Sequence, residues 1–316
     1  MQRVRFGKTE LEITPVGFGA WAIGGGGWAA AWGPQDDDEA VGAIRRAVEL
    51  GINWVDTAAV YGLGHSEELV ALALKDVPEA DRPYVFTKCS LVWDESGDIQ
   101  NVLKKDSVKR ECEESLRRLG VDVIDLYQIH WPKPDEEIEE GWEALSELKE
   151  EGKVRHVGVS NFDTGQMERA NGIAPVETLQ PPYNMLRRDV EDEILPYARK
   201  NDVGVIVYSP MASGLLTGKM TRERVENMPA DDWRRNSEQF NDPKLSKNLE
   251  LVERLREIGG RHDKSPAEVA IAWTLRHPAV SAAIVGGRRP DQVDGIVGAA
   301  DFRLSEDEIA EVEAAL

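Results

Sequence analysis

Residues 123–160 read VIDLYQIHWPKPDEEIEEGWEALSELKEEGKVRHVGVS. A strand-like apolar run, 123–130, opens this stretch, and a second one, 154–160, closes it. Between them lies a segment with helical hydrophobic periodicity, and Gly152 stands where such a helix should end. This order of strand, helix and strand predicts a βαβ unit, in which the two strands lie parallel.

The same pattern of strand and helix recurs along the whole chain. Six further strand-like runs occupy residues 15–21, 52–57, 84–88, 177–181, 203–209 and 280–285. Gly51 and Gly120 stand where helices should end, and Ser265 and Ser305 each begin a capping box that marks a helix start. Eight strands are the number in a closed barrel, whereas a doubly wound sheet needs fewer strands and a switch point midway.

We therefore predict an α/β fold, a single (β/α)8 TIM barrel that occupies residues 1–316 as one domain. A β-hairpin that turns at residues 7–9 is expected before the first barrel strand, and additional helices are expected at the C-terminus. Residues 211–247 are too many for an ordinary connection between barrel elements, so we predict a functional flap there.

The composition narrows the range of functions. Lys and Arg number 38 against 58 Asp and Glu, which gives a net charge of −20. Nucleic acids and anionic membranes attract basic surfaces, so neither is an expected partner. Cys89 and Cys112 are too few for a disulfide framework and favour the reducing cytoplasm. The uncharged stretch 13–35 holds seven glycines, which suits a strand and a loop better than a membrane helix.

Four chemically useful side chains stand at or just after the ends of predicted strands. Asp56 ends the second strand and Tyr61 follows it, while Lys88 ends the third and His130 the fourth. A barrel directs such strand ends to one shared cavity. There the Lys88 ammonium would favour the phenolate and lower the pKa of Tyr61, and Asp56 would keep Lys88 charged. Tyr61 could then exchange a proton with an oxygen atom, and His130 could polarise a carbonyl group.

These residues do not fit several other reactions that barrels catalyse. No strand end carries the carboxylate pair of a glycosidase, and no histidine or cysteine spacing indicates a metal site. The nucleophile elbow of serine hydrolases is absent as well. The attacking group must therefore come from a cofactor. A phosphate site is predicted after the last strand, at Gly286, Gly287, Arg288, Arg289 and Pro290, where a helix begins.

Two short glycine motifs resemble nucleotide-binding sequences but lack the required context. Residues 17–22 (GFGAWA) fit G-x-G-x-x-A, yet more glycines follow instead of a helix, which argues against a Rossmann site. Residues 214–219 (GLLTGK) are one residue shorter than a Walker A loop, which argues against ATP binding.

The motifs at the strand ends resemble those of the aldo-keto reductase family over nearly the whole chain. They are residues 51–58 (GINWVDTA) with Tyr61 and Gly62, 86–88 (FTK), 125–131 (DLYQIHW) and 158–162 (GVSNF). Residues 180–184 (QPPYN), 214–219 and 286–292 look most similar to the bacterial stress-related, NADPH-dependent branch. The resemblance implies a (β/α)8 barrel without a Rossmann motif and NADPH as the usual cofactor.

The resemblance also assigns a catalytic tetrad and a set of cofactor contacts. The tetrad is Asp56, Tyr61, Lys88 and His130, and Tyr61 protonates the carbonyl oxygen as hydride arrives from the nicotinamide. The cofactor contacts fall on Ala20, Trp21, Asp56, Ser160, Asn161, Gln180, Tyr208, Ser209, Pro210, Met211, Ser213, Gly214, Leu215, Lys219, Gly286, Gly287, Arg288 and Gln292.

Several of these contacts have individual roles by resemblance. Asn161 and Gln180 hold the carboxamide, and Tyr208 stacks on the nicotinamide ring. The loop after the seventh strand wraps the pyrophosphate. Arg288 meets the 2′-phosphate that distinguishes NADPH from NADH, and Gln292 meets the adenosine.

Three tryptophans are expected to line the substrate pocket, and two positions depart from the family pattern. Trp32, Trp93 and Trp131 fall on predicted loops at the barrel mouth, where aromatic walls suit an apolar or ring-bearing substrate. Ile296 replaces a frequent asparagine near the adenine, which predicts looser adenine contacts. Gly287 replaces the usual alanine, which is a mild change.

The sequence thus favours an NADP-dependent oxidoreductase that reduces aldehydes or ketones to alcohols. Its expected partner is a small carbonyl or alcohol substrate. Two alternatives stay open. The same residues allow a polyol or sugar dehydrogenase that works in the oxidation direction. A regulatory subunit that senses nucleotide state, resembling the potassium-channel β subunits, is also compatible with this sequence.

Overall fold

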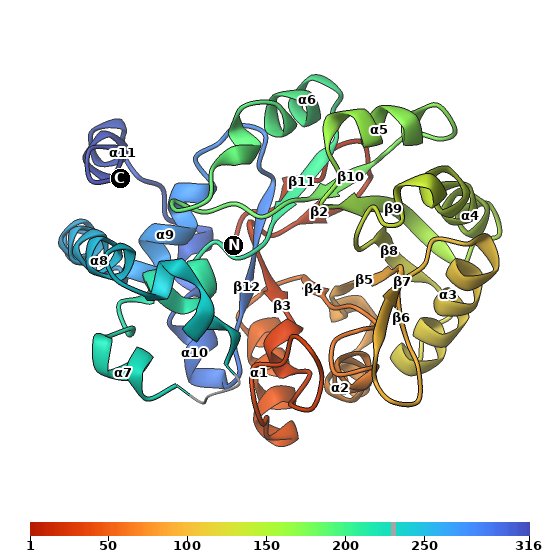
Figure 1. Ribbon diagram of the computed structural model, residues 1–316, viewed down its shortest axis with the longest axis horizontal. Helices are drawn as coiled ribbons and strands as arrows, with labels where there is room; N and C mark the ends of the chain where they lie inside the picture. The colour runs from red at the N-terminus through yellow and green to blue at the C-terminus, as the bar shows by residue number, and fades with distance from the viewer. Residues whose placement is uncertain (229–231) are drawn as a thin grey trace.

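A closed barrel of eight parallel strands forms the centre of the computed structural model, which describes residues 1–228 and 232–316 (Figure 1). The strands follow one another around the barrel in chain order, and the last pairs with the first. They are β3 (Val16–Gly19), β4 (Trp54–Asp56), β5 (Tyr84–Cys89), β8 (Ile124–Ile129), β9 (Val154–Ser160), β10 (Thr178–Gln180), β11 (Gly204–Val207) and β12 (Ala282–Gly286). The predicted (β/α)8 fold and its eight strands are confirmed.

Helices connect the strands and surround the barrel (Figure 1). They are α1 (Asp37–Glu49), α2 (His65–Leu74), α3 (Lys105–Leu119), α4 (Ile138–Glu150), α5 (Thr164–Asn171), α6 (Ile194–Lys200), α7 (Arg222–Glu226), α8 (Lys244–Gly260), α9 (Pro266–Thr274), α10 (Pro290–Asp294) and α11 (Glu306–Glu313). The capping boxes predicted at Ser265 and Ser305 begin α9 and α11. After α3, Gly120 takes a φ of 65°, a left-handed conformation that favours glycine and ends the helix.

Two hairpins flank the barrel strands. The predicted N-terminal hairpin is confirmed, because β1 (Val4–Arg5) pairs antiparallel with β2 (Glu12–Ile13). A second hairpin, β6 (Leu91–Trp93) with β7 (Ile99–Asn101), lies between β5 and α3 and was not predicted. Residues 91–101 are part of a connection that the sequence pattern assigns to a loop.

Large apolar side chains fill the N-terminal half of the barrel interior. Phe6 from the N-terminal hairpin stacks on Phe86 at 6.0 Å between ring centroids, and Trp54 stacks on Phe86 at 5.3 Å. Leu126 and Ile206 belong to the same buried cluster. The hairpin therefore closes one end of the barrel, which leaves the carboxyl ends of the strands as the open end.

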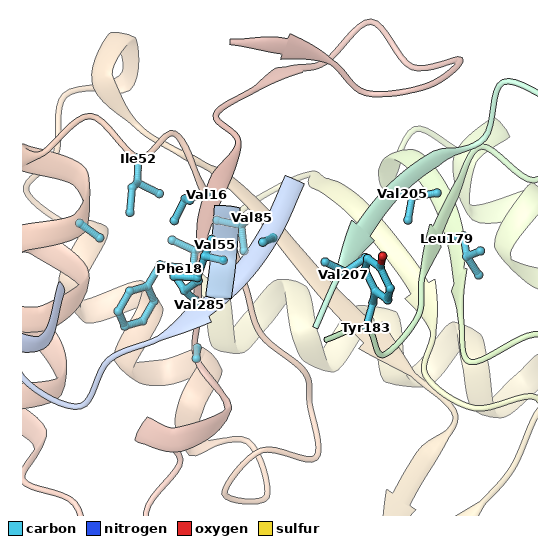
Figure 2. Packing of buried hydrophobic residues seen from close by; sticks show 14 of the residues in the cluster. Val16, Phe18, Ile52, Val55, Val85, Leu179, Tyr183, Val205, Val207 and Val285 are labelled. Carbon is cyan, nitrogen blue, oxygen red and sulfur yellow. The ribbon is translucent and has the colours of Figure 1, made fainter. Parts of the chain in front are cut away.

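The outward-facing side of the barrel packs against the helices in a larger apolar core. Figure 2 shows Phe18, Val55 and Val285, from the three neighbouring strands β3, β4 and β12, packed together in this core. On the other side of the barrel, Val205 and Leu179 belong to the same cluster. Burial on both faces explains why the barrel strands read as nearly continuous apolar runs.

The long segment between β11 and α8 has little regular structure. It contains the 3-10 helices η5 (Ala212–Thr217), η6 (Trp233–Asn236) and η7 (Glu238–Phe240) besides α7. Part of the predicted flap at 211–247, residues 229–231, lies outside the described residues. Its function as a flap stays a prediction.

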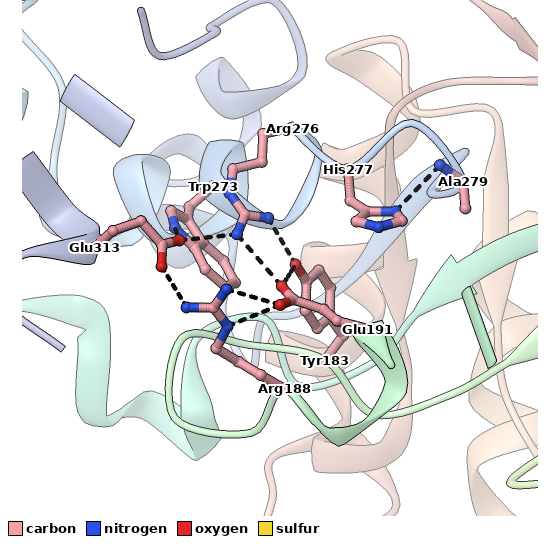
Figure 3. A network of polar contacts seen from close by, with 8 residues as sticks. All are labelled: Tyr183, Arg188, Glu191, Trp273, Arg276, His277, Ala279 and Glu313. Atoms are coloured by element: carbon pink, nitrogen blue, oxygen red, sulfur yellow. Dashed lines mark hydrogen bonds and ion pairs between the residues drawn. The ribbon is translucent and has the colours of Figure 1, made fainter. Parts of the chain in front are cut away.

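A polar cluster ties the C-terminal helix α11 to the barrel (Figure 3). Arg276, just after α9, donates hydrogen bonds to Tyr183 Oη at 2.7 Å and to Glu313 of α11 at 2.9 Å. Its guanidinium lies 3.8 Å from the centroid of the Trp273 ring. Arg188 pairs with both Glu191 and Glu313. The additional C-terminal helices that the sequence predicts are therefore confirmed, and α11 is anchored by charged hydrogen bonds.

Candidate active site

The inward-facing side chains change from apolar to polar toward the open end of the barrel. Because alternate residues of a strand face the same side, the residue two positions after an interior aromatic or leucine also points inward. The pairs are Trp54 and Asp56 on β4, Phe86 and Lys88 on β5, and Leu126 and Gln128 on β8. The apolar half of the barrel thus carries a buried polar layer above it.

A buried ion pair lies at the centre of this layer. Lys88 Nζ donates to Asp56 Oδ1 at 2.6 Å and to the Thr57 carbonyl oxygen at 2.8 Å. The other carboxylate oxygen of Asp56 accepts from Gln180 Nε2 at 2.8 Å, and Gln128 Nε2 lies 3.5 Å from it. The Lys88 and Asp56 side chains are only 0% and 4% exposed, so each charge depends on the other for its compensation.

Tyr61 and His130 lie over this ion pair. Lys88 Nζ is 5.3 Å from the centroid of the Tyr61 ring. The rings of Tyr61 and His130 meet edge to face with their centroids 5.6 Å apart. The structure therefore brings together all four residues of the predicted tetrad, although two lie on the strands β4 and β5 and two on the connections after β4 and β8.

Burial sets the protonation of these groups. Burial, the charge of Asp56 and the neighbouring Tyr208 raise the pKa of Tyr61 well above 10. The expectation that Lys88 lowers the pKa of Tyr61 is therefore wrong, because the apolar surroundings disfavour the phenolate more strongly. Burial also lowers the pKa of Lys88, which Asp56 opposes. Burial and the charge of Lys88 lower the pKa of His130 well below 6.5. Near neutral pH, Tyr61 and His130 are both uncharged.

Indole rings wall the space around the Tyr61 ring. Trp21 stacks on Tyr61 at 6.3 Å between centroids, and Trp28 lies 6.1 Å from it. Both indole N–H groups already have hydrogen-bond partners, since Trp21 Nε1 donates to the Ala30 carbonyl and Trp28 Nε1 donates to the Gly25 carbonyl. Trp28, which sequence reasoning did not single out, thus presents an apolar surface next to the phenol.

The predicted nicotinamide contacts meet at the ends of β9, β10 and β11. Tyr208 Oη donates to Asn161 Oδ1 at 2.8 Å, and Asn161 Nδ2 donates to the His130 carbonyl at 2.9 Å. Ser160 Oγ donates to the Gln180 carbonyl at 2.8 Å. The amide of Gln180 is directed at Asp56, so the part of its side chain left for a carboxamide is its oxygen.

The chain after β11 takes an unusual backbone path. Ser209, Ala212 and Ser213 have φ angles of 56°, 47° and 55°, all in the left-handed region. Pro210 and Met211 lie within this turn, and Lys219 follows it at the surface. Leu215 is different, because its side chain is fully buried in a separate apolar cluster with Met220 and Phe240. Only the backbone of Leu215 could serve the predicted pyrophosphate contact.

Two glycines leave room for a ligand at the open end of the barrel. A Cβ atom added to Gly286 would meet only the Gly19 carbonyl oxygen at 3.6 Å, and one added to Gly214 would meet only an Arg234 nitrogen at 3.9 Å. These glycines lie at the end of β12 and in η5, where phosphate groups commonly bind in barrels. Gly287 is more crowded, since its Cβ would lie 3.1 Å from Val293. An alanine there would require the Val293 side chain to shift slightly.

Cationic side chains border the same space. Arg288 donates to Gln35 Oε1 at 2.6 Å and to the Trp32 carbonyl at 3.1 Å, and its backbone N–H donates to Gln292 Oε1 at 2.7 Å. Its remaining guanidinium nitrogen donates to the Pro34 carbonyl, so all three nitrogens have uncharged partners, and no carboxylate of the described residues pairs with Arg288. The open glycines, an arginine without a carboxylate partner and the polar strand ends together fit a dinucleotide with phosphate groups.

The remaining predicted positions lie in different surroundings. Trp32 packs edge to face against Trp21 at 5.3 Å, and Trp131 is exposed at the end of β8. Trp93 lies in β6 against Arg118 of α3, with 5.8 Å between the guanidinium and the ring centroid. Ile296 is buried in the outer core. The pocket roles of Trp32, Trp93 and Trp131 stay predictions.

Comparison with known proteins identifies the family. Residues 15–316 match the profile described as the aldo/keto reductase family. The chain belongs to the aldo/keto reductase family.

Relatives of this aldo-keto reductase cover nearly its full length. An aldo-keto reductase of Bacillus subtilis is 36% identical and aligns over 100% of this chain and 94% of its own. The NADH-specific methylglyoxal reductase of Escherichia coli is 34% identical over 97% of this chain and 95% of its own. The solved structure of a glycerol dehydrogenase from Gluconobacter oxydans has a TM-score of 0.91 and 38% identity, over 100% of this chain and 95% of its own.

Membership of the family establishes an oxidoreductase that acts on carbonyl or alcohol groups of small molecules with a nicotinamide cofactor. Within the described ranges, no cluster of three or more His, Cys, Asp or Glu side chains could hold a metal ion. In the same residues, no helix has both the length and the apolar character of a membrane span.

Sequence reasoning missed several residues of the site. Gln128 lies on β8 two positions after the inward-facing Leu126, and this spacing alone could have placed it in the polar layer. Trp28 and Arg234 lie on irregular segments, where no periodicity indicates which way a side chain points. The carbonyl of Thr57, which accepts from Lys88, is a backbone group and leaves no trace in the residue pattern.

Proposed function

We propose that the protein reduces aldehydes or ketones to alcohols with NADPH, and that Tyr61 is the general acid. The observation that carries this proposal is the buried Asp56–Lys88 pair beneath an uncharged Tyr61, with His130 at its edge. A nicotinamide cofactor, when bound, supplies the hydride for the carbonyl carbon.

The protein side chains then control the carbonyl oxygen. Tyr61 and the neutral His130 would both reach an oxygen placed between them and hold it by hydrogen bonds. Negative charge that develops on this oxygen is stabilised by the preorganised Lys88 ammonium, which water does not screen. Tyr61 Oη gives its proton to the oxygen, and Lys88 stabilises the phenolate that remains. Trp21 and Trp28 exclude water from this step.

Replacing Tyr61 by Phe tests the assignment. The Tyr61→Phe variant should lose turnover of every carbonyl in a panel of aldehydes and ketones and still bind the cofactor, measured by fluorescence titration. Tyr84→Phe is the matched control, because Tyr84 begins β5 at the opposite end of the barrel. Full activity of Tyr61→Phe would refute the mechanism.

The preference for NADPH is the second part of the proposal. Arg288 supports it, because no carboxylate of the described residues neutralises this side chain. The Escherichia coli relative is named as NADH-specific, so the preference needs a direct test. Arg288→Gln should weaken NADPH binding about 10- to 100-fold, the value of a charged hydrogen bond to phosphate, and leave NADH binding nearly unchanged. Arg254→Gln, which removes an exposed arginine of α8 paired with Glu257, is the control. Equal affinity of the unmodified protein for both cofactors would contradict the proposal.

Oxidation of a polyol is a second candidate function. The glycerol dehydrogenase with a TM-score of 0.91 supports it. The apolar walls at Trp21 and Trp28 favour the first candidate, because both indole N–H groups are occupied and offer no partner to a hydroxyl-rich substrate. Comparing turnover of NADP⁺ with glycerol against NADPH with an aromatic aldehyde distinguishes the two directions.

A further inference from the structure

Glu111 of α3 is a buried carboxylate that the proposed reaction does not use. It is 4% exposed, and no ion pair joins it to a cation within residues 1–228 and 232–316. Its two oxygens accept hydrogen bonds from the Ser90 backbone N–H at 2.9 Å and from Ser107 Oγ at 3.1 Å. A carboxylate without a counter-ion is costly to bury, so the hydrogen bond from Ser90 is its principal compensation.

Ser90 connects Glu111 to the open end of the barrel. Its φ of 85° lies in the left-handed region, which is unfavourable for a residue with a side chain and needs support from its surroundings. It stands two positions after Lys88. Its hydroxyl oxygen accepts from the Trp131 backbone N–H at 3.3 Å, and the neighbouring Cys89 carbonyl accepts from the His130 N–H at 3.1 Å. A continuous path of hydrogen bonds therefore runs from α3 through the end of β5 to the end of β8.

We propose that Glu111 is a positioning residue of the substrate pocket: its carboxylate holds Ser90 in the left-handed conformation and thereby fixes Trp131 beside His130. The position of the Trp131 backbone follows from the contacts above, whereas its effect on substrate rests on the proposed function. Ser90 contacts the backbone of Trp131, and the indole, 37% exposed at the open end with Lys133 Nζ 5.9 Å from its ring centroid, would then form a wall for a ring-bearing carbonyl substrate.

The charge of Glu111, and with it the strength of the hydrogen bond from Ser90, is expected to change with pH near neutrality. Burial raises the pKa of Glu111 to about 7, although the hydrogen bonds from Ser90 and Ser107 oppose the increase. The carboxylate form accepts a charge-assisted bond from Ser90, and the protonated form accepts a weaker one. The hydrogen bond from the Ser90 N–H to Glu111 is therefore strong above pH 7 and weakens as the pH falls below 7. Ser90 and the Trp131 backbone are then held less rigidly.

Four titratable side chains near this path have pKa values shifted away from neutrality. Burial raises the pKa of Cys89 and Tyr127 well above their usual values, and it raises the pKa of Cys112 to about 12. The pKa of His130 lies well below 6.5. The charged neighbours on α3 are Arg110 and Glu114, and the Glu67–Arg118 ion pair lies between α2 and α3.

The test follows Trp131 directly and needs neither cofactor nor substrate. The protein is labelled with 5-fluorotryptophan, and its Trp131 resonance is assigned by comparison with Trp131→Phe. In the unmodified protein this ¹⁹F resonance should shift between pH 5.5 and 8.5 with a midpoint near the pKa of Glu111, about 7. Glu111→Gln, which keeps the shape and an acceptor for Ser90, should abolish the shift. Glu113→Gln removes the same charge from an exposed position of α3 and should behave like the unmodified protein.

A second variant tests the proposal even if Glu111→Gln does not fold. Ser90→Gly adopts a φ of 85° without support and lacks the hydroxyl bonded to Trp131, so it should fold and show no pH-dependent shift. With an aromatic aldehyde, KM of the unmodified protein should rise about fivefold from pH 8 to pH 6, the difference between a charge-assisted and a neutral hydrogen bond. In Glu111→Gln, KM should be high at both pH values, while kcat varies with pH as in the unmodified protein.

A Trp131 resonance that stays constant with pH in the unmodified protein would overturn the proposal. A shift that persists in Glu111→Gln would overturn it as well, because another group would then be responsible. The proposed function fails on a different observation, full turnover by Tyr61→Phe, which does not affect the fluorine measurement.

Discussion

The ion pair of Asp56 and Lys88 allows a quantitative test of how the buried polar layer is stabilised. Asp56→Asn leaves the Lys88 ammonium, which is 0% exposed, with the Thr57 carbonyl and an amide oxygen as its partners. Lys88→Met leaves the Asp56 carboxylate with the amide of Gln180. Each single variant thus buries one charge without compensation, whereas the double variant buries none.

The expected magnitudes follow from this difference. A buried charge without a partner costs about 3–5 kcal/mol, and replacing both members of a buried pair by uncharged residues costs less than the sum of the two single losses. We expect each single variant to lose about 4 kcal/mol of unfolding free energy and the double variant to lose about 3 kcal/mol. The double variant should therefore be about 5 kcal/mol more stable than the sum of the single losses predicts, a large coupling for a pair in contact.

Equilibrium unfolding in urea at pH 7.5 measures these quantities. With a denaturant dependence of about 3 kcal/mol per M urea, each single variant should unfold at a midpoint about 1.3 M lower. Turnover should be lost in all three variants, so the double variant regains stability without activity. Arg254→Met is the control, because it breaks exposed pairs at the surface of α8 and should leave the midpoint unchanged.

Additive single losses would refute the reasoning. If the double variant loses the sum of the two single values within about 0.5 kcal/mol, the charges do not depend on each other. The ion pair would then be a by-product of the fold, and the argument that Lys88 stays charged because of Asp56 would fail.

Three further predictions concern the barrel and its helices. Gly17→Ala should lower the unfolding free energy by about 3 kcal/mol, measured in urea, because the added Cβ would lie 2.1 Å from the buried Trp54 ring. Glu177→Gln should be less stable than the unmodified protein at pH 6, and the difference should vanish as the pH falls from 4.5 to 2. The reason is that burial raises the pKa of Glu177, but hydrogen bonds from His156, Lys149 and the Val157 N–H together outweigh it and lower the pKa from 4.5 to about 2. Its contribution of up to about 3 kcal/mol is therefore full above pH 4.5. Ser265→Ala should cost about 1 kcal/mol in thermal unfolding experiments by removing the cap of α9, and no loss would contradict the capping role.

Much of the site could be predicted because it lies on strands. Asp56, Lys88 and His130 each end or follow an apolar run, and a parallel barrel has one end at which all such residues meet. Trp28 could not be predicted in the same way. Its ring reaches Tyr61 because Gly25 and Gly27 take left-handed φ angles of 80° and 83°, and a glycine-rich loop permits many other paths.

The sequence by itself determined the order of the elements, the closed barrel and the identity of the four residues at its open end, because hydrophobic periodicity and strand polarity are local properties. Only the tertiary structure decided the protonation of Tyr61. Its position beside Lys88 predicts a lower pKa, yet burial in the folded barrel raises it. The pKa depends on how many apolar atoms surround the phenol, and those atoms come from segments as distant as Trp21 and Tyr208.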